Sequence, residues 1–172
     1  MSTIISHPAV PIALSAFFPD HTLSPEILLL GAICSMIPDL DVIGFAFGVR
    51  YGDLWGHRGM THSVLFAACL AAFLAVLSHE GGGWPAFLFL FLSTLSHPIV
   101  DAFTDGGLGV ALFAPFSKKR YFFPWRPIAV PPIGIRAFFS AWGWRVLKSE
   151  IRWIWLPSSL VFGVGLAVKS LL

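Results

Sequence analysis

Five strongly apolar segments dominate this chain and constrain what it can fold into. Apolar residues make up 56% of the 172 positions and charged residues only 12%, about half the share of a typical soluble domain. An apolar helix of about 20 residues crosses a bilayer, and the last two segments approach that length. The sequence therefore predicts an all-α fold, a polytopic transmembrane helical bundle with about four or five spans. The segments cover residues 4–18, 26–38, 63–78, 84–103 and 153–172.

Lysine and arginine residues between the segments indicate how the chain is oriented. The connections at 19–25 and 79–83 contain neither residue type, whereas 50–60 carries Arg50 and Arg58 and 104–152 carries eight basic residues. Basic connections tend to stay in the cytoplasm. We therefore expect the N-terminus inside, the C-terminus outside, and the two basic connections on the cytoplasmic side.

The stretch at 106–152 combines basic and aromatic residues. Residues 116–132 are also rich in proline and predict an ordered re-entrant or interfacial loop on the cytoplasmic side. Residues 136–155 predict an amphipathic helix on the membrane surface, with its basic face toward anionic headgroups. We treat 1–172 as a single membrane domain, made of site helices (1–105), this loop and interfacial helix (106–152), and a last span (153–172).

Other features of the sequence exclude several functions. A net charge of +2 is too small to indicate a nucleic-acid partner, and no nucleic-acid-binding motif is present. The first residues lack the basic region and cleavage site of a signal peptide, so we expect them to belong to the fold. Cys34 and Cys69 lie in apolar segments, where we expect both to pack between helices.

Seven potential metal ligands lie at or beside the ends of the apolar segments. Ionisable side chains at membrane depth are costly and are usually retained for function. The topology derived from basic residues places all seven on the cytoplasmic side, although it used none of them. His21 and His79 fall on the opposite side and are excluded. The seven are His7, Asp39, Asp41, His57, His62, His97 and Asp101.

The spacing of the acidic residues indicates how they are presented. His97 and Asp101 are four positions apart, so they share one helix face and can bind the same ion or adjacent ions. The alternative is a buried polar pair that links helices. Asp39 and Asp41 would diverge on a regular helix, but Pro38 favours irregular backbone on which both carboxylates converge. A simpler alternative is that Asp39 caps the following helix.

The motif HRGMTHS at 57–63 contains two histidines that share no helical face. Neighbouring glycines allow His57 to lie in a loop and fold back over His62, with Thr61 as the N-cap of the next helix. Arg58 is a candidate phosphate clamp, because a guanidinium binds phosphate oxygens with two hydrogen bonds. Each histidine taken alone is more often a buried side chain with satisfied hydrogen bonds.

Imidazole and carboxylate groups without thiolates fit zinc, with manganese or iron as alternatives. Six or seven ligands are too many for one tetrahedral ion and fit two or three ions bridged by carboxylates. Such a centre activates water and stabilises both reacting oxygens of a phosphoester. We expect Asp39, Arg58 and Asp101 to take part in catalysis. A serine nucleophile at Ser63 or Ser96 is an alternative, but no glycine elbow accompanies either.

Four motifs, taken in order, resemble a known family: IPDLD at 37–41, HRGMTHS at 57–63, SHPIVDAFTDGG at 96–107 and LFAPFSKKRYFFPWRPI at 112–128. Together they are similar to the YdjM/YbcI-type family of bacterial inner-membrane, metal-dependent hydrolases, over roughly residues 1–130. The resemblance implies a multi-pass protein of the inner membrane with a metal-dependent hydrolase site. It also implies distant kinship with the zinc phospholipase C and P1 nuclease group, in which His97 and Asp101 would match the HxxxD ligands and Asp101 would bridge ions.

These observations favour a membrane-bound, metal-dependent hydrolase of a phosphoester in a lipid or membrane-associated substrate. Arg58, helped by Arg120 or Arg126, would neutralise the phosphate. Two non-catalytic alternatives are a protein that transports or handles metal ions and a structural scaffold whose polar clusters only pack helices. Transport predicts polar groups along a path through both membrane faces, and the outer half of this chain has few.

Overall fold

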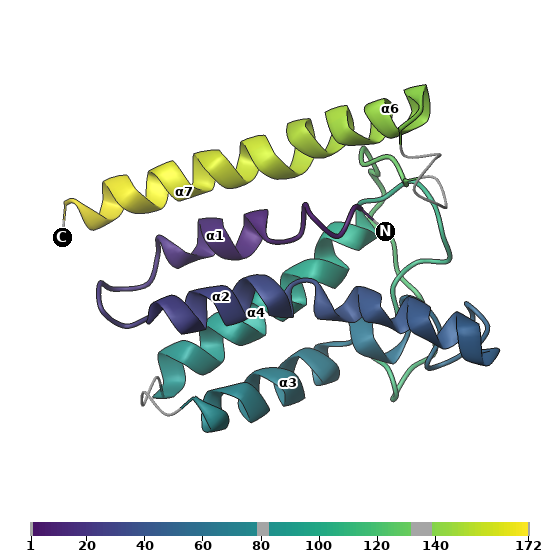
Figure 1. Ribbon diagram of the computed structural model, residues 1–172, viewed down its shortest axis with the longest axis horizontal. Helices are drawn as coiled ribbons and strands as arrows, with labels where there is room; N and C mark the ends of the chain where they lie inside the picture. The colour runs from purple at the N-terminus through teal and green to yellow at the C-terminus, as the bar shows by residue number, and fades with distance from the viewer. Residues whose placement is uncertain (1, 79–82, 132–138, 172) are drawn as a thin grey trace.

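The fold of the chain is helical. A computed structural model describes residues 2–78, 83–131 and 139–171, and these contain no β-strand, only the isolated bridges Thr104–Ile128 and Val110–Tyr121. The expected all-α class is confirmed. In chain order the elements are α1 (Ala9–Ser15), α2 (Pro25–Cys34), the 3₁₀ helices η1 (Ile37–Phe47) and η2 (Met60–His62), α3 (Val64–Leu77), α4 (Gly83–Ala102), α6 (Ala141–Glu150), the π-helical turn η3 (Ile151–Trp155) and α7 (Leu156–Lys169), as Figure 1 shows.

Serine residues cap three of these helices. The side chains of Ser24, Ser63 and Ser140 accept a backbone N–H from the first turn of α2, α3 and α6, which satisfies one of the donors that a helix start leaves free. The N-cap of α3 is therefore Ser63, and the prediction that Thr61 has this role was wrong. Thr61 and His62 form the end of η2, so the α-helix starts later than expected.

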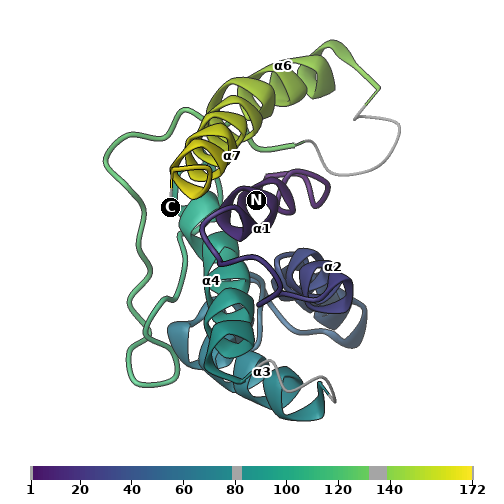
Figure 2. The ribbon, with the colours of Figure 1, turned by 90° about the vertical axis from the view of Figure 1, so that its left-hand side faces the viewer.

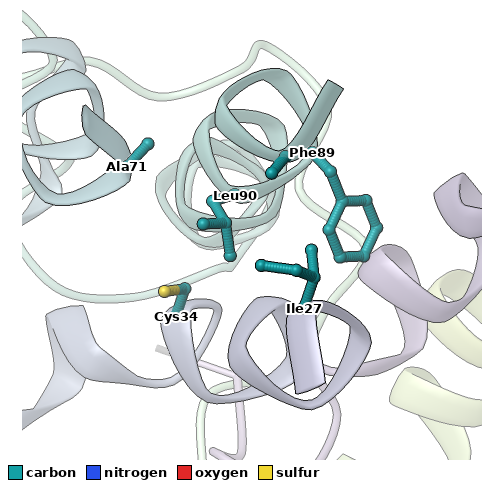
Figure 3. Packing of buried hydrophobic residues seen from close by; sticks show 6 residues of the cluster. Ile27, Cys34, Ala71, Phe89 and Leu90 are labelled. Carbon is teal, nitrogen blue, oxygen red and sulfur yellow. The ribbon is translucent and has the colours of Figure 1, made fainter. Parts of the chain in front are cut away.

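The apolar core lies between α2, α3 and α4. Its buried side chains are Ile27, Cys34, Ala71, Ala86, Phe89 and Leu90 (Figure 3). Cys34 packs between helices as predicted, whereas Cys69 is exposed on α3, so the same prediction was wrong for Cys69. Many large apolar side chains elsewhere are exposed, as expected of a protein surface that faces lipid.

Gly31 allows α2 to approach α4 closely. A Cβ at this position would lie 2.3 Å from the Phe89 ring, which is itself buried. We expect Gly31→Ala to lower the free energy of unfolding by about 1–3 kcal/mol, the usual cost of overpacking a core. Thermal unfolding in detergent measures this. Gly163→Ala is the control, because a Cβ there meets no described atom within 4 Å; equal effects of the two changes would contradict the packing argument.

Fewer helices than expected are long enough to cross a membrane. Among the described residues, Gly83–Ala102 and the continuous helix Ala141–Lys169 qualify by length and composition, and the pair α2 and η1, bent by 42°, would make a third. The count of four or five spans is therefore not confirmed. Helix α1 has 7 residues and α3 has 14, which are short for a span of about 20 residues.

The predicted interfacial helix and last span form one continuous helix. Residues 141–169 run through α6, η3 and α7 without a break (Figure 1), so the expectation of two separate elements was wrong. Pro157 lacks the N–H that would continue the α-helical bonding pattern, and the π-helical turn comes directly before the segment that contains it. The predicted interfacial helix begins at residue 136, and residues 136–138 lie outside the described part of the chain.

Residues 103–131, the described part of the connection that follows α4, form hydrogen bonds to the rest of the protein. Phe123 donates its N–H to Ala102 O and Ile128 donates its N–H to Phe103 O, which fasten the returning chain to the end of α4. Figure 2 shows most of this described part on the left, away from α1 and α2. An ordered loop was predicted here; its position relative to the membrane stays a prediction.

Candidate metal centre

The seven predicted ligands lie together at one end of the bundle. This is the end to which the C-terminus of α4 points, at the right of Figure 1. The residues before α1 contribute His7, η1 contributes both aspartates of IPDLD, the loop and η2 contribute His57 and His62, and α4 contributes His97 and Asp101. Six of the seven are buried, and Asp41 is partly buried.

Four of these residues form the tightest group of donor atoms. One donor atom each from Asp39, His62, His97 and Asp101 lies within 4.8 Å of all the others. His97 Nε2 is 3.3 Å from Asp39 Oδ1 and 4.0 Å from Asp101 Oδ2, and His62 Nε2 is 3.0 Å from His97 Nε2. Two carboxylates and two imidazoles at this spacing could hold a metal ion. The predicted pairing of His97 with Asp101 on one helix face is confirmed.

Contacts of the Nδ1 atoms of His62 and His97 direct their Nε2 atoms toward the carboxylates of Asp39 and Asp101. His97 Nδ1 lies 2.7 Å from the carbonyl oxygen of Ser35, which only accepts, so Nδ1 carries a proton and Nε2 is the ring nitrogen that can offer a lone pair to a metal ion. His62 Nδ1 lies 3.2 Å from Asp41 Oδ2, which favours the same tautomer. Two such lone pairs facing each other favour a cation between them.

The Asp39 carboxylate is buried beside the imidazoles of His7, His62 and His97. Its side chain is about 1% exposed, and neither oxygen accepts a hydrogen bond from any residue that the structure describes. Buried polar groups nearly always have such partners, because an unsatisfied one costs free energy. The alternative that Asp39 caps a helix is wrong, since no described backbone N–H donates to it. A cation would supply the missing partner.

His7 lies beside His97 and faces the second oxygen of each of the two carboxylates. Its Nε2 atom is 3.9 Å from Asp39 Oδ2 and 4.0 Å from Asp101 Oδ1, the oxygens that do not face His97. Its ring stacks on His97 with 3.7 Å between centroids. Asp39 and Asp101 therefore each present one oxygen to the His62–His97 side and the other to the His7 side, which is how carboxylates bridge two ions.

Asp41 connects two histidines. Asp39 and Asp41 do diverge, because η1 is a 3₁₀ helix in which residues two apart point about 120° from each other. Asp41 Oδ1 is 2.6 Å from His57 Nδ1, and Oδ2 accepts from the Arg58 backbone N–H and the Thr61 hydroxyl. Asp41, His57 and His62 also form a second group of potential ligands within 4.8 Å.

Arg58 is buried against Asp101. Its Nε atom lies 3.0 Å from Asp101 Oδ2, Nη1 donates to Gly106 O, and Nη2 donates to the Thr104 hydroxyl. The side chain has no exposed surface. Nη1 and Nη2 thus donate hydrogen bonds within the protein, and Nε is paired with the Asp101 carboxylate. A phosphate bound by Arg58 would have to replace these contacts.

Glycine residues shape the loop that carries His57 and Arg58. A Cβ at Gly56 would lie 2.1 Å from Arg50 O, and one at Gly59 would lie 2.2 Å from Leu54 O, so only glycine fits at either position. Arg58 itself has φ of 62°, in the left-handed region that side chains rarely adopt. The predicted fold of His57 back from a loop is confirmed.

Arg120 holds the same loop from the α4–α6 connection. Its guanidinium donates to the backbone carbonyl oxygens of Tyr51, Asp53, His57, Arg58 and Gly109. Two of these residues, His57 and Arg58, belong to the candidate site. Burial lowers the pKa of Arg120, but a guanidinium remains charged at neutral pH. Arg120 therefore acts on the loop backbone, and the predicted contact with substrate phosphate stays a prediction.

We expect Arg120→Ala to loosen the loop at 50–60. The change leaves partly buried carbonyl groups without a donor, which should lower the free energy of unfolding by about 1–3 kcal/mol. Limited proteolysis should cut this loop faster than in the wild type. The neighbouring Lys119→Ala removes an exposed side chain and is the control. Unchanged cleavage in the Arg120 variant would contradict this role.

Several polar residues around the site were not predicted from the sequence. They are Ser2, Thr61 in its contact with Asp41, Thr104 and Glu150. Glu150 left one signal, since it is the sole acidic residue after Asp105. The serine and threonine residues left none, because such residues are common at helix ends.

The fold and site together define a helical membrane protein with a buried His/Asp cluster that could hold a metal ion. The profile of a family described as YdjM inner membrane protein matches residues 1–171. Inner membrane protein YbcI of Escherichia coli (strain K12) is 40% identical over 167 residues, which cover 95% of this chain and 96% of that protein. No solved structure matches. The chain belongs to the YdjM family of inner membrane proteins, as its motifs indicated.

Proposed function

We propose that this protein is a membrane-bound, metal-dependent hydrolase of phosphoester bonds in a lipid or membrane-associated substrate. One observation carries the metal-binding part of the proposal: Asp39 is buried among three other donor residues and accepts no hydrogen bond from the described residues. A protein keeps such a group in its interior when a cation completes it.

The donor set fits zinc, with manganese or iron as alternatives. One ion would be held by Asp39, His62, His97 and Asp101, and a second by His7 with the other oxygens of both carboxylates. When bound, such ions supply Lewis-acid stabilisation of charge and a water nucleophile at neutral pH. A carboxylate that faces both positions would offset part of the repulsion between the two positive ions.

Other residues of the chain would orient the ligands. Ser35 and Asp41 fix the rings of His97 and His62 through their Nδ1 atoms, a contact that in metal sites typically changes affinity or activity 10–100-fold. Arg58 holds Asp101 in place and offsets part of its charge. His57, turned toward Asp41, would extend this hydrogen-bonded network to the loop.

A basic and aromatic surface would bind the phosphate group of the substrate. Four exposed cations between residues 126 and 152 lie over aromatic rings: Arg126 over Phe122, Arg145 over Trp142, Lys148 over Trp144 and Arg152 over Trp153. Such pairs suit the headgroup layer of a membrane, where anionic phosphates meet apolar chains. We place this surface and the metal centre on the cytoplasmic side, because the basic connections favour that orientation.

A non-catalytic metal centre is the second candidate, and the closure of the site favours it. His7, His62, His97 and Asp101 have no exposed surface, and Asp39 is 2% exposed. A structural ion needs no access, whereas a hydrolase must open the site to water and substrate. The two candidate functions therefore differ in one measurable property: a hydrolase binds metal and turns over substrate, whereas a non-catalytic centre only binds metal.

Metal analysis combined with an activity screen tests the proposal. Protein purified in detergent should contain a stoichiometric divalent metal and hydrolyse a phospholipid or a chromogenic phosphodiester, and a chelator should abolish both. His62→Ala should lose metal and activity, whereas His21→Ala, an exposed histidine distant in sequence from the ligands, should lose neither. Metal without turnover would favour the non-catalytic candidate, and protein without metal would contradict both.

A further inference from the structure

Glu150 is a buried carboxylate that the proposed chemistry does not use. It has no exposed surface and lies at the end of α6. A buried carboxylate is costly unless its oxygens accept hydrogen bonds. Here the donors are the backbone N–H and hydroxyl of Thr3 and the hydroxyl of Ser6. The indole N–H of Trp155 also donates to Ser6 Oγ, at 3.0 Å.

These contacts fasten a segment that we call the N-terminal strap, residues 2–7, to the long helix of α6, η3 and α7. The opposite side of the strap touches the metal centre. Ser2 donates its backbone N–H to Asp101 Oδ1 at 3.0 Å, and Ser2 Oγ lies 2.9 Å from His7 Nε2. The strap therefore links the proposed centre to a helix that contributes no ligand to it.

We propose that Glu150 is a positioning residue for metal binding, which holds the strap so that His7 completes the second ion position with Asp39 and Asp101. This inference rests on the proposed two-ion centre. The first position, made by His62 and His97 with the same carboxylates, takes neither histidine from the strap, because these belong to η2 and α4. Loss of Glu150 should thus remove one ion and leave the other.

A second contact of the same helix provides a matched control. Lys169, near the end of α7, pairs with Asp20 at 2.6 Å, in the connection between α1 and α2. Like Glu150, Lys169 ties the C-terminal helix to the N-terminal part of the chain. It differs in joining a part of the chain that carries no predicted ligand. Lys169→Ala therefore loosens the helix without loosening the strap.

The test measures bound zinc per chain by elemental analysis after dialysis of the detergent-purified full-length protein. We expect two ions in the wild type and in Lys169→Ala, and one ion in Glu150→Ala, in His7→Ala and in the double variant. The double variant should lose no more than either single variant, because both changes disable the same position. Glu150→Gln keeps one acceptor oxygen and should recover part of the second ion.

The outcomes separate this inference from the proposed function. Two ions in Glu150→Ala with unchanged affinity would overturn the positioning role and leave the two-ion centre in place. One ion in the wild type and in every variant would also overturn it, and no ion in the wild type would overturn the metal proposal itself. If Glu150→Ala does not fold, the double change Thr3→Val and Ser6→Ala removes the hydroxyl donors of the strap to Glu150 and Trp155 instead and is judged by the same counts.

Discussion

Asp39→Asn is expected to abolish tight metal binding while leaving the metal-free protein about as stable as the wild type. Asparagine keeps the shape of the side chain but removes the negative charge that stabilises a divalent ion. Because neither oxygen of Asp39 accepts a hydrogen bond from the described residues, the change breaks none of them. The free energy of unfolding of the metal-free protein should change by less than about 1 kcal/mol.

The metal affinity of this variant should fall further than the roughly 10–100-fold typical of losing a residue that only orients a ligand. Zinc competition titrations measure that loss. A bound ligand stabilises the folded state, so a chelator should lower the melting temperature of the wild type and leave that of the variant unchanged. Asp53→Asn changes an exposed carboxylate outside the site and is the control. A variant that retains zinc, or that unfolds easily without it, would contradict a ligand role for Asp39.

The residues of the candidate centre could be predicted from the sequence because charge is rare in this chain. His97 and Asp101 stand out in a long apolar helix, where their spacing already places both on one face. The membrane topology predicted from the lysine and arginine residues then placed the other five potential ligands on the same side of the membrane as these two. Burial and donor distances could not be predicted, because they depend on how α4, η1 and the N-terminal strap pack together.

The roles of single residues were harder to predict than their proximity. Asp41 was expected to converge with Asp39, but the 3₁₀ geometry of η1 turns it toward His57 and the far side of His62. The position of Glu150 in the fold depends on the continuous helix of residues 141–169, which the sequence divides into an amphipathic part and an apolar part. Amphipathicity predicts which face of this helix is polar, and it does not predict which residues contact its buried carboxylate, Glu150.

Arg58→Ala should cause the largest loss of stability of any change discussed for this site. The substitution removes the guanidinium partner of the buried Asp101 and the donors to Gly106 and Thr104, and breaking a buried ion pair typically costs about 3–5 kcal/mol. Arg58→Lys should recover only part of it, since one ammonium group cannot reach all three partners. Denaturant unfolding in detergent measures both changes.

The same experiment separates two roles for Arg58. A residue that balances Asp101 predicts low stability and weak metal binding together, because Asp101 is a proposed ligand. A residue that clamps substrate phosphate predicts normal stability with a raised KM. Arg126→Ala, an exposed arginine over Phe122, should change stability by no more than about 0.5 kcal/mol and is the control. Since all three guanidinium nitrogens have partners within the protein, we expect the first result.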